Sequence, residues 1–124
     1  MKFYSRLALL CCVALMTTAC TAQDEQYFSV HPKALQEAIA ACPAKAPKSV
    51  SCDSLRELAI KVNELVYELR MSPQGFGKTI LSLQEKVAAE ALDNQPATKL
   101  LLSKDQTELS ERLAVVGWLE SPVS

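Results

Sequence analysis

Cysteine is the residue type in this sequence whose number and spacing most clearly indicate chemistry. Cys11 and Cys12 lie in an apolar run near the N-terminus, and Cys20 follows that run closely. The other two, Cys42 and Cys52, are separated by nine residues. An even pair of this kind predicts a disulfide in an oxidising compartment. Closing so short a loop would contribute about 2–3 kcal/mol to stability in the chain-entropy account.

Metal binding and thiol redox chemistry are the alternatives for this pair. A structural zinc site uses four ligands, mainly cysteine and histidine, and His31 is the only histidine in the sequence. A redox dithiol usually has two residues between its cysteines rather than nine. We therefore expect no metal site and no cofactor, and we assign Cys42 and Cys52 to a structural disulfide.

The segment from Ser72 to Thr79 contains an imperfect phosphate-binding motif. It reads SPQGFGKT, with the lysine and threonine spaced as in GxxxxGK[ST], but Ser72 replaces the first glycine. In nucleotide-binding proteins this loop follows a buried strand, whereas residues 55–70 have helical periodicity. We therefore interpret the segment as a turn between two helices, with Pro73 interrupting the first and the glycines permitting the turn.

Other catalytic patterns are incomplete. His31, Pro32 and Lys33 resemble the start of the HxKxxxxD motif of phospholipase D-like enzymes, but Ala38 stands at the aspartate position. No GxSxG nucleophile motif is present. We expect His31 to lie where a helix begins rather than to act as a general base, and we name no catalytic residue.

The N-terminus has the three parts of an export signal. Two basic residues precede an apolar run from Leu7 to Met16, and small residues follow. This order is typical of secretory signals, and the run is too short to span a bilayer comfortably. Two forms of processing remain open: Cys20 carries lipid in a lipoprotein, or signal peptidase cuts after Ala22. We expect residues 1–22 to be the signal and the mature protein to be a periplasmic or outer-membrane lipoprotein, alternatively a secreted protein.

The charge distribution argues against nucleic acid as a partner. All fourteen acidic residues lie at or after Asp24, while two of the thirteen basic residues belong to the signal. The remaining lysines and arginines are spread singly, without the basic cluster typical of nucleic-acid binding. We expect contact with a membrane only through a lipid on Cys20.

Helical periodicity predicts the first half of the fold. Pro32 is suited to the first turn of a short helix that Pro43 ends. Ser51 or Asp53 can cap the next helix. The clearest apolar stripe in the sequence then recurs at steps of three and four residues, formed by Leu55, Leu58, Val62, Leu65 and Leu69.

Two further apolar stretches complete the predicted fold. One runs from about Gly77 to Leu92, and the last follows Ser103 and Gln106, whose spacing resembles a capping box. We expect an all-α fold: a small antiparallel helical bundle of three main helices plus a short first helix, after the N-terminal export signal. Residues 23–31 would form a tether and residues 32–124 the helical domain.

Export, a small helical fold and the lack of a catalytic cluster favour a binding role. We expect a small, exported, non-catalytic envelope protein that binds another envelope or secreted protein through a surface of its helical bundle. A groove between such helices can accept an amphipathic partner helix. The alternative is a secreted small enzyme of hydrolase or nuclease type, or a soluble exported effector.

Overall fold

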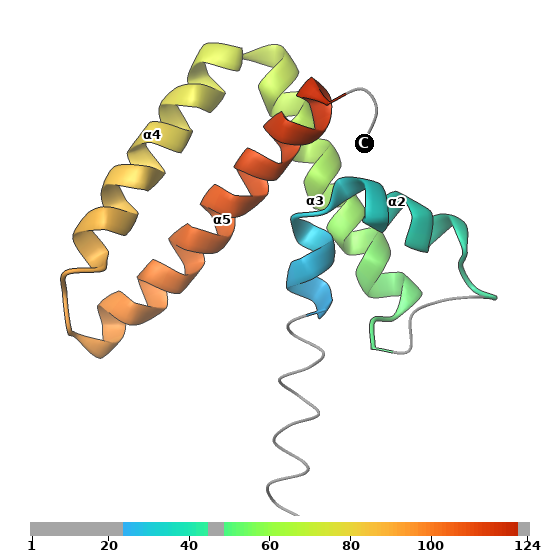
Figure 1. The fold of residues 1–124 in the computed structure, drawn as a ribbon, viewed down its shortest axis with the longest axis horizontal. Coiled ribbons are helices and arrows are strands. Elements are labelled where there is room, and N and C mark those ends of the chain that lie inside the picture. Colours follow the sequence, from blue (N-terminus) through green and yellow to red (C-terminus); the bar gives the residue numbers. More distant parts are fainter. Residues whose placement is uncertain (1–23, 45–48, 122–124) are drawn as a thin grey trace, which may run out of the picture.

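Helices dominate the structure. The computed structural model describes residues 24–44 and 49–121, and no strand occurs in these ranges. The all-helical class expected from the sequence is therefore confirmed for this part of the chain. The main helices are α2 (Pro32–Ala40), α3 (Cys52–Met71), α4 (Pro73–Glu90) and α5 (Pro96–Glu120) (Figure 1).

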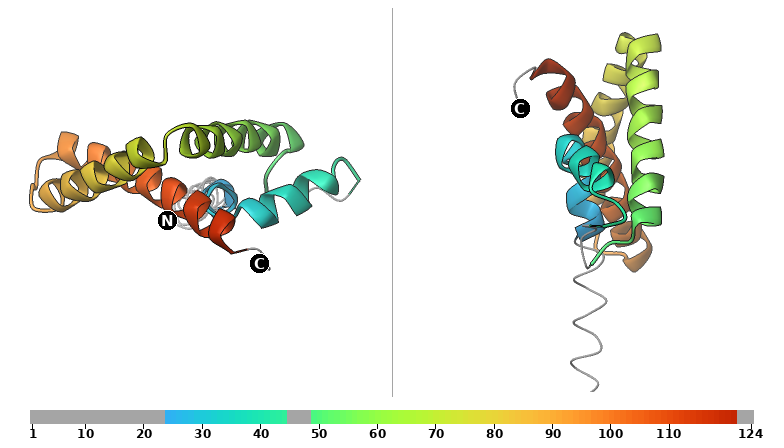
Figure 2. Two further views of the ribbon diagram at one scale, coloured as in Figure 1. Left: turned by 90° about the horizontal axis from the view of Figure 1, so that it is seen from above. Right: turned by 90° about the vertical axis from the view of Figure 1, so that its right-hand side faces the viewer.

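The helices pack as an antiparallel hairpin crossed by a third helix. α4 and α5 run side by side in opposite directions, and α3 crosses the end of this hairpin (Figure 1). α2 packs against both α3 and α5. Seen from above, α3 forms one edge of the molecule, so one of its sides faces outward (Figure 2). The core lies where these helices meet and is formed by Leu35, Val50, Leu55, Val62, Leu65, Phe76 and Val115.

A single serine separates α3 from α4. The Ser72 hydroxyl accepts a hydrogen bond from the Gly75 backbone N–H at 3.2 Å, so it caps α4. A side chain at Gly75 would place its Cβ 2.7 Å from the Ser72 hydroxyl oxygen, which explains glycine there. The turn expected within residues 72–79 is therefore shorter than predicted, since α4 begins at Pro73 rather than near Gly77. Proline suits this first position because the first-turn N–H groups have no partner within the helix.

The last helix is longer than the sequence pattern predicted. α5 is continuous from Pro96, and Ser103 lies inside it, where its carbonyl accepts a hydrogen bond from the Thr107 hydroxyl. The capping box expected at Ser103 is therefore wrong. Asp93 organises the actual start of the helix, because its carboxylate accepts hydrogen bonds from the Gln95 N–H and the Thr98 hydroxyl.

The segment directly before α2 is also helical. Residues 24–29 form helical turns, although we expected a tether over residues 23–31. Phe28 packs against the core and Ser29 is buried. The apolar side chain of Phe28 explains the difference, because burying it against the core holds the segment on the domain.

The predicted cysteine pair closes the corner between α2 and α3. Cys42 and Cys52 lie at disulfide distance, with their Cα atoms 6.1 Å apart. Cys52 is the first residue of α3, which Ser51 caps by accepting a hydrogen bond from the Ser54 N–H at 3.1 Å. Cys20, the lipidation candidate, and the proposed signal over residues 1–22 lie outside the described residues. Among the helices that are described, none is both long and apolar enough to cross a membrane.

Candidate functional site

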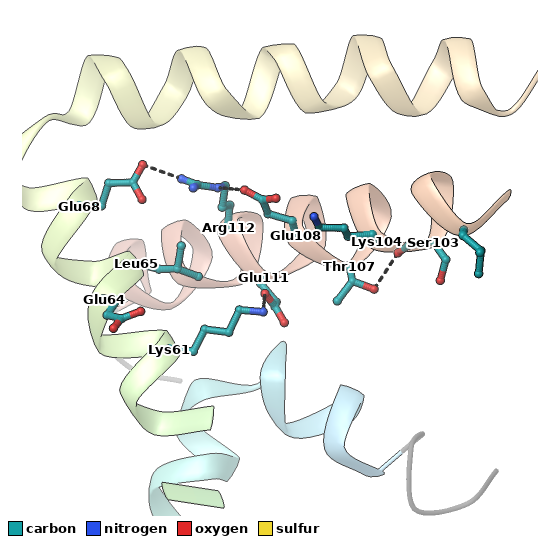
Figure 3. Close-up of a pocket in the computed structure, with 11 residues that line it drawn as sticks. Lys61, Glu64, Leu65, Glu68, Ser103, Lys104, Thr107, Glu108, Glu111 and Arg112 are labelled. Atoms are coloured by element: carbon teal, nitrogen blue, oxygen red, sulfur yellow. Dashed lines mark hydrogen bonds and ion pairs between the residues drawn. The ribbon is translucent and has the colours of Figure 1, made fainter. Parts of the chain in front are cut away.

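A pocket of about 560 Å³ lies between α3 and the N-terminal half of α5 (Figure 3). It exists because the two helices meet near the core and diverge from there. We call it the α3–α5 pocket. One wall belongs to α3 and consists of Lys61, Glu64, Leu65 and Glu68. The other belongs to α5 and consists of Leu100, Ser103, Lys104, Thr107, Glu108, Glu111 and Arg112.

An ion pair joins the two walls at the inner end of the pocket. Lys61 Nζ lies 2.7 Å from Glu111 Oε2, and the Glu111 side chain is only 5% exposed. Glu57, one turn earlier on the same helix, stands at the spacing of a local ion pair with Lys61. Lys61 pairs with Glu111 instead, because a buried carboxylate without a cation would raise the free energy of the folded state.

Arg112 forms a second connection between the walls. Its guanidinium donates hydrogen bonds to Glu68 at 2.9 Å and to Glu108 at 3.2 Å, and it lies 4.8 Å from the centre of the Phe76 ring. Burial alone would lower the pKa of Arg112, but the two carboxylates outweigh burial and raise it. Arg112 is therefore held in its charged form and fixes the position of both glutamates.

Two charged side chains of the pocket have no such partner. Neither Glu64 on α3 nor Lys104 on α5 takes part in a hydrogen bond or ion pair within the described residues. Both side chains are exposed. The pocket therefore has three ion pairs in its interior, one of Lys61 and two of Arg112, and one unpaired charge of each sign on its walls.

Apolar side chains border the same pocket. Leu100 is 76% exposed on the α5 wall, and the neighbouring Leu101 is also exposed. On α3, an exposed stripe runs beside Glu64 because its members fall at helical spacing with that residue. We call this set the outer α3 stripe; it consists of Ile60, Tyr67 and Met71. Glu64 interrupts this stripe between Ile60 and Tyr67, and the stripe lies next to the pocket lining rather than within it.

The segment with the imperfect phosphate motif does not form a phosphate-binding loop. Residues 73–79 are the first turns of α4, and the Thr79 hydroxyl donates a hydrogen bond to the Gly75 carbonyl. The preceding element is α3, a helix rather than a strand. Neither Lys78 nor Thr79 lines the α3–α5 pocket.

His31 lies at the start of α2, as the sequence predicted. Its Nδ1 is 2.7 Å from the Tyr27 carbonyl, and its ring stacks on the Tyr27 ring with centroids 4.0 Å apart. His31 also lines a second pocket, of about 540 Å³, with Lys33 and Trp118. Within residues 24–44 and 49–121, no group of three or more His, Cys, Asp or Glu side chains is arranged to hold a metal ion.

The sequence did not single out the charged residues of the α3–α5 pocket. Glu111 and Arg112 are buried, although both residue types are normally exposed. One signal was present: Glu111 precedes the core residue Val115 by four positions, so it falls on the core-facing side of its helix. Its partner Lys61 lies fifty positions earlier, which no local pattern predicts.

Comparison with known proteins finds no counterpart for this chain. No family model matches it, and no curated protein or solved structure matches it significantly.

Proposed function

We propose that this chain is a small, exported, non-catalytic envelope protein that binds another protein through the α3–α5 pocket and the outer α3 stripe. The single observation that carries the proposal is the exposure of Leu100 at the edge of this pocket. A leucine side chain in water loses the favourable free energy that burial would give it. Covering it with a partner restores that contribution.

The surroundings of Leu100 support a protein as the partner. Ile60, Tyr67 and Met71 add apolar and aromatic surface next to the pocket, and aromatic residues and methionine are enriched where proteins meet. Lys61 and Arg112 pair with three glutamates in the pocket interior, which therefore keeps one excess negative charge. A protein surface can cover such a mixed lining.

The N-terminal sequence supports placement outside the cytoplasm. Residues 1–22 have the order of an export signal, and a disulfide-bonded pair such as Cys42–Cys52 is typical of oxidising compartments. We propose a periplasmic or outer-membrane location, with lipid on Cys20 as the anchor, or secretion after cleavage behind Ala22. The intact mass of the native protein tests this: a mature N-terminus at Cys20 or Gln23 supports export, and retention of Met1–Ala22 contradicts it.

Co-purification of variants tests the binding role. Leu100→Arg places a charge at the edge of the pocket, and Leu81→Arg makes the same change at another exposed leucine. Leu81 is 61% exposed on α4, two positions from the buried Leu83, so it points away from α5. We expect the protein that co-purifies with the wild type to be reduced about tenfold or more by Leu100→Arg. We expect Leu81→Arg to retain it, whereas equal effects would contradict the proposal.

A further inference from the structure

The two unpaired charges of the α3–α5 pocket have opposite signs and lie on opposite walls. Glu64 belongs to α3 and Lys104 to α5 (Figure 3). The other charges that line the pocket are already committed to the Lys61–Glu111 pair and to the Arg112 contacts with Glu68 and Glu108. A bound partner therefore meets one acidic wall position and one basic wall position.

Apolar side chains stand at the two ends of the pocket, with charged and polar side chains between them. Leu100 precedes Lys104 by four residues, so both lie on the same face of α5. Leu65 lies on the α3 wall, one residue after Glu64, and is nearly buried. A partner that fills the pocket therefore needs apolar side chains that reach Leu65 and Leu100, and its two edges meet walls with unpaired charges of opposite sign.

The length of the α5 wall matches a short helical segment. Both walls are helices, and the part of α5 from Leu100 to Arg112 is about 18 Å long at 1.5 Å per residue. A segment of about three helical turns has the same length. Helices pack side by side at about 8–10 Å, and amphipathic helices bind in grooves through residues at helical spacing.

We infer that the occupant of the α3–α5 pocket is an amphipathic helix of about three turns from a partner protein, with a basic residue facing Glu64 and an acidic residue facing Lys104. Its apolar face covers Leu100 and the rim of Leu65. This inference rests on the proposed function, because it names the partner of the same surface. The complementary charges set the register of the helix, while the leucines supply most of the affinity.

A synthetic peptide with this pattern is the probe. It has a leucine face, lysines along one edge and glutamates along the other, and a dye reports its binding to the purified, disulfide-bonded protein by anisotropy. We expect Glu64→Lys and Lys104→Glu each to raise the Kd about three- to tenfold, because attraction is replaced by repulsion. We expect the same charge changes at exposed sites on α4, Glu85→Lys and Lys78→Glu, to change the Kd less than about twofold.

Compensating changes in the peptide test each charge contact separately. A peptide whose edge lysines are replaced by glutamates should bind Glu64→Lys more tightly than it binds the wild type. Circular dichroism checks that all variants remain helical. Equal responses at the pocket sites and at the α4 sites would overturn the charge pattern that we infer.

The outcomes separate this inference from the proposed function. If the peptide fails to bind while Leu100→Arg still removes the co-purifying protein, the partner is not this kind of helix and the inference fails alone. If Leu100→Arg has no more effect than Leu81→Arg, both fail. Peptide binding that depends on Glu64 and Lys104 supports both.

Discussion

Arg112 on α5 donates a hydrogen bond to Glu68 on α3 across 2.9 Å, although the two residues are 44 positions apart in the sequence. The same guanidinium contacts Glu108 one turn earlier on its own helix. One side chain thereby fixes both walls of the α3–α5 pocket. Stability of the helix crossing and integrity of the pocket are consequently linked through Arg112.

Removing the Arg112 side chain should destabilise the fold. Arg112→Ala leaves Glu68 and Glu108 without their cation and uncovers the Phe76 ring, so we expect a loss of about 1–3 kcal/mol in the free energy of unfolding. Arg56→Ala is the control, because Arg56 pairs with Asp53 at an exposed site and should cost less than about 1 kcal/mol. Urea denaturation compares the two, and similar losses would contradict a central role for Arg112.

Truncating Leu65, in the middle of the central apolar stripe, should lower the free energy of unfolding more than Arg112→Ala does. Leu65 is 9% exposed and belongs to the core, so we expect Leu65→Ala to lower the free energy of unfolding by about 2–5 kcal/mol. Ile60 lies on the same helix and is 59% exposed. Ile60→Ala should stay within about 0.5 kcal/mol. Thermal and urea unfolding provide the measurement; a loss below about 0.5 kcal/mol for Leu65→Ala would mean that its contacts are not formed.

The corner between α2 and α3 should depend on the disulfide. Replacing both Cys42 and Cys52 with serine releases the loop constraint, and we expect a loss of about 2–3 kcal/mol from the chain-entropy account. Treating the wild type with a reductant should lower its midpoint of unfolding, and the same treatment should leave the double variant unchanged. A wild-type midpoint that does not respond to reduction would argue that the two thiols are not joined.

Glu90 should make the stability of the fold depend on pH. Partial loss of hydration, a hydrogen bond to Asp105 and repulsion from the same residue raise the pKa of Glu90, while Lys86 opposes this. A raised folded-state pKa means that Glu90 favours folding below its unfolded pKa and loses that contribution as the pH rises through the folded pKa. Glu90→Gln should therefore be more stable than the wild type near pH 7, and the difference should shrink on acidification.

Asp93 should behave in the opposite way. Hydrogen bonds from the Gln95 N–H and the Thr98 hydroxyl lower its pKa. Asp93 therefore stabilises the fold above its unfolded pKa and loses this effect as the pH falls through the folded pKa. Asp93→Asn should be less stable than the wild type at pH 7, with a difference that disappears in acid. Unfolding midpoints measured from pH 3 to 7 would reject the assignment if both variants followed the same trend.

Local patterns predicted the elements of this protein better than its contacts. Spacing between neighbouring residues predicted Ser51 as one of two candidate caps of α3, the core stripe through Leu65 and the pairing of Cys42 with Cys52. The spacing of Ser103 and Gln106 predicted a helix start that is wrong, because α5 already begins at Pro96 and continues through Ser103.

The candidate site could not be predicted in the same way. Its walls come from helices far apart in sequence, and Lys61 and Glu111 meet only because α3 crosses α5. Leucine is a residue type that is often buried, whereas the structure leaves Leu100 76% exposed. The divergence of α3 from the N-terminal half of α5 is a tertiary property, and it decides which leucines are covered.

Site-specific photocrosslinking in intact cells tests the central claim most directly. A photoreactive amino acid at Leu100 or at Tyr67 samples the α5 side or the α3 side of the proposed binding surface. One at Leu81 samples the side of α4 that points away from α5. We predict that the positions of Leu100 and Tyr67 yield the same discrete crosslinked protein and that the position of Leu81 does not. Crosslinking of that protein with equal yield from all three positions, or from the Leu81 position alone, would contradict the proposed binding surface.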